Sequence, residues 1–201
     1  MSRYTGPRVR VMRALGVDLP GLSPKTSDRR PFRPGQHGNQ RHKITEYGKR
    51  LIEKQKLRFN YGLRERQLQN LMKEASASRQ NTSTKLAELV ERRLDNAVFR
   101  SRFAVSIPAA RQLVNHGHIL VNNKKVDIPS FRIKVGDVIA VRDRSKKHAS
   151  VVAGTESRRL FETDWLDVNE GELKSTVKAL PDEHSILFPI EMQLIIEFNS
   201  R

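Results

Sequence analysis

Apolar side chains recur at helical spacing through the middle of the chain. They predict three helices, over about 45–62, 64–75 and 83–98, the third with an unbroken apolar stripe. An Asn-Thr-Ser stretch at 81–83 can cap the third helix, and Gly62 is a plausible end for the first. Three amphipathic helices joined by short loops are expected to pack against one another.

After Ser106 the predicted elements become shorter. Ser106 can cap a short helix that has a proline in its first turn, and Gly117 can end it. Residues 118–122 and 125–128 then predict a tight hairpin around an Asn-Asn turn. Residues 131–135 alternate apolar and polar side chains with the period of a strand.

The last third of the chain adds strands and one more helix. Residues 138–141 predict a strand, and 165–168 with 173–180 predict a second hairpin. An apolar stretch that opens at Pro189 predicts a final helix that returns to the helical domain.

These elements predict an α+β fold. It has a helical domain of three to four helices, closed by the C-terminal helix, and a small helix–β-hairpin domain, with a basic extended N-terminal segment ahead of both. The expected boundaries are 1–43 for the basic extended segment, 44–91 with 186–201 for the helical domain, 92–152 for the helix–hairpin domain, and 153–185 for an acidic hairpin region attached to it.

The charge of the chain indicates its class of partner. The 201 residues carry a formal charge of +16. Residues 1–90 hold 20 basic and 7 acidic side chains, residues 91–153 hold 13 and 5, and residues 154–201 hold 5 and 10. A basic chain that can still build a core favours a polyanion, with nucleic acid ahead of an anionic membrane surface. We expect the acidic block to face away from that polyanion, toward solvent or a basic protein.

Several classes are excluded. No run of eighteen apolar residues can span a membrane, and the N-terminus lacks the apolar core of a secretory signal. With no cysteine, disulfide scaffolds and thiolate-bound zinc are ruled out, and a reducing compartment is expected. His116 and His118 alone fall short of a four-ligand zinc site, so we predict no metal and no other cofactor.

Catalytic motifs are not supported. The chain has no Gly-rich phosphate loop, no Gly-x-Ser-x-Gly and no convincing pair of acids. Arg93-Leu94-Asp95 has the form of the tripeptide that carries the catalytic Asp of pseudouridine synthases, but here it continues inside a helical pattern. We interpret Asp95 as the partner of a nearby base such as Arg92, and we expect neither an enzyme nor a small-molecule substrate.

Two regions supply candidate nucleic-acid contacts. Residues 1–43 hold ten basic side chains and five of the nine prolines, which favours an extension that becomes ordered on phosphates over a flexible tail. The helix–turn–hairpin at 106–128 gathers guanidinium, amide, imidazole and ammonium donors that suit phosphate and ribose oxygens, although an ordinary solvated face remains the alternative. The basic runs at 54–58 and 64–66, with Tyr61 among them, fit either base stacking or a core.

The chain resembles the bacterial-type family of small-subunit ribosomal protein S4. The stretches that carry the resemblance are SRYTGPR (2–8), RPGQHG (33–38), EKQKLRFNYGLRERQ (53–67), ERRLDNAVFR (91–100), ARQLVNHGHILVNNKKVDIPS (110–130) and IIEFNSR (195–201). They span the whole chain. Enzymes that share only the small RNA-binding module, such as tyrosyl-tRNA synthetases, would match 92–150 alone.

This resemblance implies a structural protein that binds small-subunit ribosomal RNA early in assembly and nucleates the subunit body. It implies a place at the messenger-RNA entrance beside ribosomal proteins three, five and twelve, an effect on translational accuracy and, in some members, repression of the protein's own translation. It also implies a ribosome-bound protein of the cytoplasm, or of the plastid stroma if organelle-encoded, with no membrane partner. The acidic block matches the family weakly.

The RNA contacts expected from charge, spacing and resemblance together are Arg3, Arg8, Arg10, Arg13, Arg33, His37, Arg41, Lys43, Lys54, Lys56, Arg58, Tyr61, Arg64, Arg66, Arg92, Arg93, Arg111, Gln112, Asn115, His116, His118, Asn122, Lys124 and Lys125.

Overall fold

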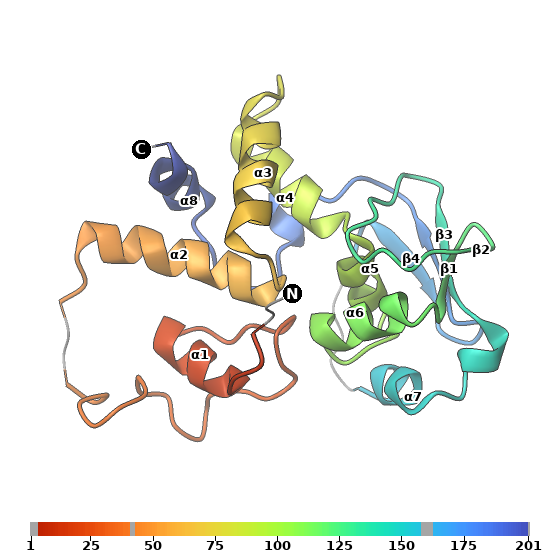
Figure 1. Ribbon diagram of the computed structural model, residues 1–201, viewed down its shortest axis with the longest axis horizontal. Coiled ribbons are helices and arrows are strands. Elements are labelled where there is room, and N and C mark those ends of the chain that lie inside the picture. Colours follow the sequence, from red (N-terminus) through yellow and green to blue (C-terminus); the bar gives the residue numbers. More distant parts are fainter. Residues whose placement is uncertain (1–3, 41–42, 158–162, 201) are drawn as a thin grey trace. The chain divides into compact units, whose positions relative to one another are not determined.

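The computed structural model describes residues 4–40, 43–157 and 163–200, which form helices and one small sheet (Figure 1). The described helices are α1 (Arg8–Leu15), α2 (Glu46–Asn60), α3 (Glu65–Ser76), α4 (Thr82–Glu91), α5 (Leu94–Arg100), α6 (Ile107–Asn115), α7 (Ala149–Thr155) and α8 (Met192–Asn199). The strands are β1 (Ile119–Val121), β2 (Lys124–Lys125), β3 (Val138–Val141), β4 (Leu166–Asn169) and β5 (Lys174–Val177). Two short 3₁₀ turns are η1 (Asp143–Ser145) and η2 (Glu183–Ser185).

The chain divides into two compact units. Unit 1 comprises residues 1–86 and 186–201, and unit 2 comprises residues 87–185. The division falls inside α4, five residues before the boundary expected at 91/92. The predicted α+β class is confirmed, with a helical part followed by a small mixed part.

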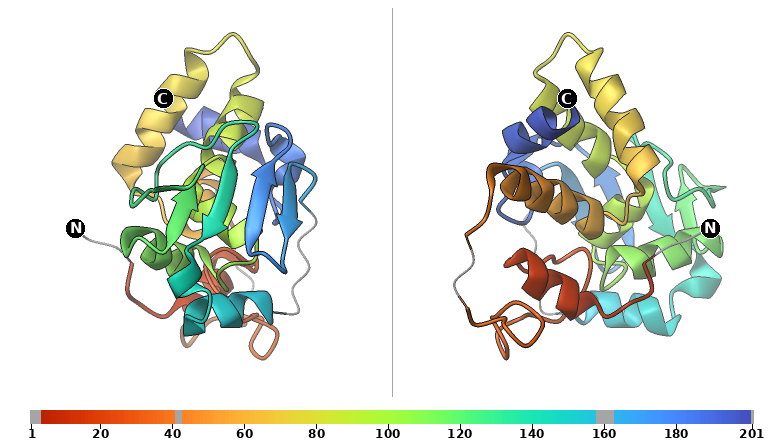
Figure 2. Two further views of the ribbon diagram at one scale, coloured as in Figure 1. Left: turned by 90° about the vertical axis from the view of Figure 1, so that its right-hand side faces the viewer. Right: turned by 60° about the vertical axis from the view of Figure 1, so that its left-hand side comes forward.

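In unit 1 the C-terminal helix closes the helical domain, as predicted. Helix α8 packs along α2 (Figure 2). The Tyr47 and Phe198 rings lie 5.4 Å apart, and Arg50 NH2 lies 3.1 Å from Glu197 Oε2. Ile195, on the inner side of α8, is fully buried. Burying this apolar face drives the association of two helices that are 132 or more residues apart in the sequence.

The basic N-terminal segment is not extended throughout, in contrast to the prediction. It contains α1, which ends at Gly16 in the left-handed conformation that glycine favours. Met12, Leu19 and Leu22 are buried, and Asn60 Oδ1 on α2 accepts a 2.9 Å hydrogen bond from the backbone of Gly21. The segment therefore has apolar side chains with which to anchor itself, although residues 23–40, all of which the structure describes, form turns and no further helix.

Unit 2 is built on an antiparallel sheet with the strand order β2-β1-β3-β5-β4. Pairing of Val121 with Ile139, and of Ile139 with Ser175, puts these side chains on one face, and all three are buried. Helices α5 and α6 pack together beside this sheet (Figure 1). The other face carries exposed polar side chains such as Asp167 and Thr176, so the sheet has one buried face and one solvent-exposed face.

The predicted third helix is wrong in one respect, because it breaks in the middle. Arg93 is extended (φ −69°, ψ 138°) between the end of α4 and the start of α5. The segment 129–133 occupies the break. There the backbone N–H of Leu94 donates to the carbonyl of Phe131 (2.8 Å), and that of Ile133 donates to the carbonyl of Arg92 (3.1 Å). The apolar stripe stays in register across the break, so periodicity alone does not reveal it.

The predictions for the hairpin region need further corrections. Residues 131–135 do not form a strand, because their backbone groups pair with the α4–α5 break through a single bridge between Arg93 and Arg132. The second strand of the first hairpin is limited to 124–125. Helix α7 was not predicted. Its Gly154 sits so close to the 102–104 backbone that an added Cβ would lie 2.6 Å from the Ala104 nitrogen.

Candidate nucleic-acid interface

The turn from α6 into β1 is set by local sequence. Ser106 caps α6 by accepting a 3.4 Å hydrogen bond from the backbone of Ala109, as predicted. The apolar side chains of α6 are buried, which leaves Gln112, Asn115 and His116 exposed. Gly117 follows at φ +70° and lets the chain reverse into β1. Three predicted contact residues thus lie at the exposed end of one helix.

The β1–β2 hairpin bends back over this turn. A Cβ on Gly117 would lie 2.3 Å from Lys125 Cε, so a larger residue there would displace the end of the lysine side chain. Asn122 and Asn123 have φ of 49° and 63°, which suits asparagine in a two-residue turn. The exposed lysines at 124 and 125 therefore project from a hairpin with a defined shape.

The side chain of Asn122 makes hydrogen bonds within the fold. Its amide nitrogen donates to Asp137 Oδ1 (2.8 Å), and its amide oxygen accepts from the backbone of Val138 (2.9 Å). Its two side-chain polar groups therefore both hold the hairpin against the start of β3. The prediction that Asn122 contacts RNA remains untested, but its role in shaping the turn was not predicted.

A buried ion network underlies α6. Asp95 is fully buried, and its Oδ2 lies 2.8 Å from Arg93 NH2 and 2.6 Å from Arg111 NH2. The predicted partner Arg92 pairs instead with Glu88 at 2.5 Å. Asp95 is therefore fully buried and held between two guanidinium groups, an arrangement typical of a structural ion network.

Consequently, the predicted RNA contacts Arg92, Arg93 and Arg111 all make ion pairs within the fold. Arg93 is 6% exposed, and Arg92 Nε donates to the carbonyl of Ile133 (2.9 Å). The Arg111 side chain keeps a quarter of its surface exposed. These residues position the 129–133 segment and α6 rather than offering free cations.

Three predicted contacts in unit 1 lie inside it. Tyr61 is 1% exposed and faces the Phe188 ring at 6.3 Å. Lys54 is buried against Glu65, with its ammonium 4.5 Å from the Phe198 ring. Because α2 packs on other helices of the unit, both lysines of the 54–58 run are buried rather than solvated.

The third of these is Lys56, whose Nζ lies 2.6 Å from Glu53 Oε1. The other Glu53 oxygen accepts a hydrogen bond from the backbone of Glu191 (3.1 Å), ahead of α8. The pair therefore belongs to the packing of α8 on α2. Arg58 is intermediate in exposure: a third of its side chain is exposed, and its guanidinium lies 3.6 Å from Glu65 Oε2.

The remaining predicted contacts of unit 1 lie mostly at its surface. Arg13 Nε donates to the carbonyl of Phe32 (2.9 Å), and Arg8 contacts the carbonyl of Leu22 (3.4 Å), so both help to shape the N-terminal loop. Arg33 is half-buried. The exposed ones are Arg10, His37, Lys43, Arg64 and Arg66. Arg3 and Arg41 lie outside the described residues.

Sequence reasoning missed a cationic segment, 142–148, that lies next to the α6–β1 turn. Arg142 NH1 donates to the carbonyl of Gly117 (3.2 Å), and Ser145 Oγ lies 2.9 Å from His118 Nδ1. The His148 ring stacks near that of His118, with centroids 4.9 Å apart. The signal was present as five basic or imidazole side chains in seven residues, RDRSKKH.

The surroundings of His118 are positive. Its pKa is held below 6.5, first by partial burial and then by the neighbouring imidazoles of His148 and His116 and the guanidinium groups of Arg144 and Arg142. Burial and the neighbouring basic groups both disfavour the charged form of the ring. A bound anion would oppose the effect of the basic groups.

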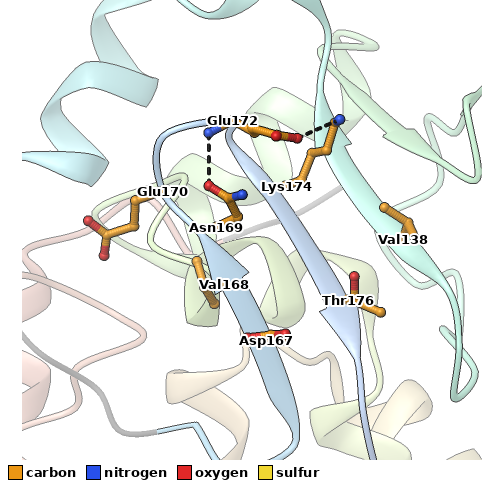
Figure 3. Close-up of a pocket in the computed structure, with 8 residues that line it drawn as sticks. All are labelled: Val138, Asp167, Val168, Asn169, Glu170, Glu172, Lys174 and Thr176. Atoms are coloured by element: carbon orange, nitrogen blue, oxygen red, sulfur yellow. Dashed lines mark hydrogen bonds and ion pairs between the residues drawn. The ribbon is translucent and has the colours of Figure 1, made fainter.

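The outward sheet face near β4 and β5 has the opposite character (Figure 3). A shallow hollow of about 660 Å³ is lined by eight residues, three of which are acidic. Lys174 Nζ lies 2.7 Å from Glu172 Oε2, and this hydrogen bond lowers the pKa of Glu172 and raises that of Lys174. Asn169 Oδ1 accepts from the backbone of Glu172 (3.1 Å). The hollow is open and its charges are paired, so it does not suit a phosphate.

Neither a metal site nor a membrane span is found in the part of the chain that the structure describes. No group of three or more His, Asp or Glu side chains there is arranged to hold a metal ion. No described helix is long and apolar enough to cross a bilayer.

Comparison with known proteins covers both units. Residues 3–91 match the family described as "Ribosomal protein S4/S9 N-terminal domain", and residues 92–139 match the "S4 domain". A curated relative from Methylobacillus flagellatus, named small ribosomal subunit protein uS4, is 49% identical over 98% of both chains. Another of that name, from Synechococcus sp. (strain JA-2-3B'a(2-13)), is 48% identical over 100% of this chain and 99% of its own. The chain therefore belongs to the uS4 family of small ribosomal subunit proteins.

Proposed function

We propose that this protein is a structural constituent of the small ribosomal subunit and binds ribosomal RNA. The observation that carries the proposal is the match to uS4 proteins along both units. The relatives are ribosomal proteins and not enzymes, in agreement with the sequence prediction.

The RNA surface we assign to unit 2 combines three elements, which we call the basic edge: the end of α6 (112–118), the hairpin tip (122–125) and the segment 142–148. Their cations lie at the surface, where they can neutralise phosphates and release counterions. The amides of Gln112 and Asn115 can accept from or donate to ribose hydroxyls. Shape and 2′-hydroxyl contacts then select the site, because the deep groove of an RNA helix hides its bases.

The finer role follows the family resemblance. The protein nucleates folding of the subunit body at a junction of several RNA helices, lies at the messenger-RNA entrance near proteins three, five and twelve, and contributes to accuracy. Repression of its own translation belongs to the same proposal. Its place is on ribosomes of the cytoplasm, or of the plastid stroma for an organelle gene.

A salt titration tests the RNA-binding claim. Affinity of the full chain for small-subunit ribosomal RNA is measured between about 50 and 200 mM monovalent salt. If about six to eight phosphates are neutralised, affinity falls roughly a thousandfold or more over this range. A nearly flat titration, or equal affinity for an unrelated RNA of the same length, would contradict the proposal.

A matched pair of variants assigns the surface. Lys124→Gln removes an exposed cation of the basic edge and is expected to lower the salt slope by about one. Lys178→Gln removes a comparably exposed cation that pairs with Asp167 near β4 (3.3 Å), and the slope should stay unchanged.

A further inference from the structure

His116, His118 and His148 meet at the basic edge, and we call them the histidine cluster. The His118 ring centroid lies 6.1 Å from that of His116 and 4.9 Å from that of His148. They come from three places: the end of α6, the start of β1 and the residue that caps α7. The fold therefore brings together imidazoles that are up to 32 residues apart.

The charged groups around the cluster are nearly all positive. Arg142 lies next to the cluster, where it donates a hydrogen bond to the carbonyl of Gly117. Arg144, in η1, is close enough to lower the pKa of His118. Lys125 lies over Gly117 from the hairpin, and Lys147 is exposed beside His148. Several cations thus surround the three imidazole rings.

The nearest carboxylates do not balance this charge. In the segment 142–148 the single acid is Asp143, whose side chain is 96% exposed and pairs with Lys146 at 2.8 Å. Asp127 lies 3.8 Å from Lys125 Nζ. Besides burial, the groups that lower the pKa of His118 are the imidazoles of His148 and His116 and the guanidiniums of Arg144 and Arg142. Among the described residues no ion pair joins a carboxylate to these imidazoles or to Arg142 or Arg144, since Asp143 and Glu172 act on lysines instead, and such a site is suited to an external anion.

We propose that the histidine cluster binds a phosphate group of the RNA and takes up a proton when it does so. This inference rests on the proposed function. In the free protein the neighbouring cations favour the neutral form of His118. A phosphate placed among them supplies the missing negative charge, favours the imidazolium form and accepts its N–H. Because the bound state holds more protons than the free state, RNA affinity falls as pH rises.

The local geometry limits where the proton goes. His148 Nδ1 accepts a 3.2 Å hydrogen bond from the backbone of Ser150 and so caps α7. That nitrogen is occupied as an acceptor, so protonation of His148 at Nδ1 would break the cap. His118 Nδ1 faces a hydroxyl, Ser145 Oγ, which can either donate or accept. His118 can therefore gain a proton without loss of a backbone hydrogen bond, whereas His148 cannot do so at Nδ1.

The experiment measures RNA affinity of the full chain at constant ionic strength, from about pH 6 to about pH 8. A pKa that differs by about one unit between the free and bound states gives about a tenfold loss of affinity over this range. His118→Asn should abolish this dependence. His148→Asn keeps a cap acceptor, because asparagine is a favoured N-cap, and should weaken it. His184→Asn, an exposed histidine in η2, is the matched control and should leave it intact.

The outcomes separate the two proposals. Tight, salt-dependent binding with no pH dependence overturns the proton uptake and leaves the proposed function standing, whereas no binding at any pH overturns the function. An equal pH dependence in His118→Asn and in the wild-type chain assigns the proton elsewhere and also overturns the inference. Calorimetry of the wild-type chain in two buffers of different ionisation enthalpy counts the protons directly, and uptake near zero at about pH 6.5 contradicts the inference without any variant.

Discussion

The two edges of the sheet in unit 2 carry opposite charges, and they also differ in how those charges are paired. Near β4, three carboxylates each have a cation of the same chain beside them. The pairs are Asp167 with Lys178 at 3.3 Å, Glu170 with Arg102, and Glu172 with Lys174 at 2.7 Å. The acidic charge of this edge is largely neutralised within the protein.

At the other edge, the two lysines of β2 have no close ion-pair partner among the described residues. Lys125 has a 3.8 Å contact with Asp127, and Lys124 has no ion-pair partner among the residues that the structure describes. The histidine cluster and Arg144 lie near the same edge without a carboxylate of their own. The contrast shows that net charge is a poor guide to partners, since what a partner meets is the charge that the fold leaves unpaired.

The largest expected contrast is between a buried acid and an acid of the β4 edge. Asp95→Ala leaves Arg93 buried without a counter-charge and should cost about 3–5 kcal/mol in the free energy of unfolding. Asp167→Ala removes an exposed pair and should change it by less than about 0.5 kcal/mol. Urea unfolding followed by circular dichroism measures both. Similar effects for the two variants would mean that the buried network does not hold the fold.

Reversing charge at the two edges is expected to have the next largest effect. Lys124→Glu with Lys125→Glu should weaken binding to small-subunit ribosomal RNA about a hundredfold at moderate salt, because two phosphate contacts become repulsive. The matched pair, Lys174→Glu with Lys178→Glu, changes the net charge equally. It should change affinity less than about threefold if the β4 edge faces away from the RNA. Equal losses in a filter-binding assay would show that only net charge matters.

The smallest expected effect is on stability in mild acid. Because the folded state holds the pKa of His118 below 6.5, the unfolded chain binds more protons as pH falls past that value, and stability declines. Glu172 has a lowered pKa, and its contribution is lost only as pH falls below 4.5. Between about pH 7.5 and 5.5, unfolding midpoints should therefore fall for the wild-type chain and fall less for His118→Asn. Parallel declines in both chains would remove His118 as the cause.

Much of the fold was predictable from local signals. Ser106, Gly117 and the Asn-Asn turn each determine one boundary, and these features lie where the sequence placed them. The break at Arg93 was not predictable from periodicity, because a segment some 38 residues further on supplies the hydrogen bonds that stabilise it. Helix α7 is only seven residues long, so its sequence pattern gave no clear periodic signal.

The candidate site was only partly predictable. Exposed residues at the end of α6 and the hairpin tip followed from spacing, whereas the burial of Lys54, Lys56 and Tyr61 depends on tertiary packing that spacing cannot show. His148 reaches His118 through the path of β3 and η1. Such a juxtaposition is a property of the sheet order, so sequence reasoning missed the basic run at 142–148 and its place beside the α6–β1 turn.

Directed cleavage of the RNA tests most directly the claim that one edge of unit 2 faces RNA and the other does not. Because the chain has no cysteine, Lys124→Cys and Lys178→Cys each create a single attachment point for an iron chelate that generates hydroxyl radicals. With each labelled protein bound to intact small-subunit ribosomal RNA, we predict strong cleavage at one multi-helix junction from position 124 and weak, scattered cleavage from position 178. Equal cleavage from both positions, or stronger cleavage from position 178, would contradict the account.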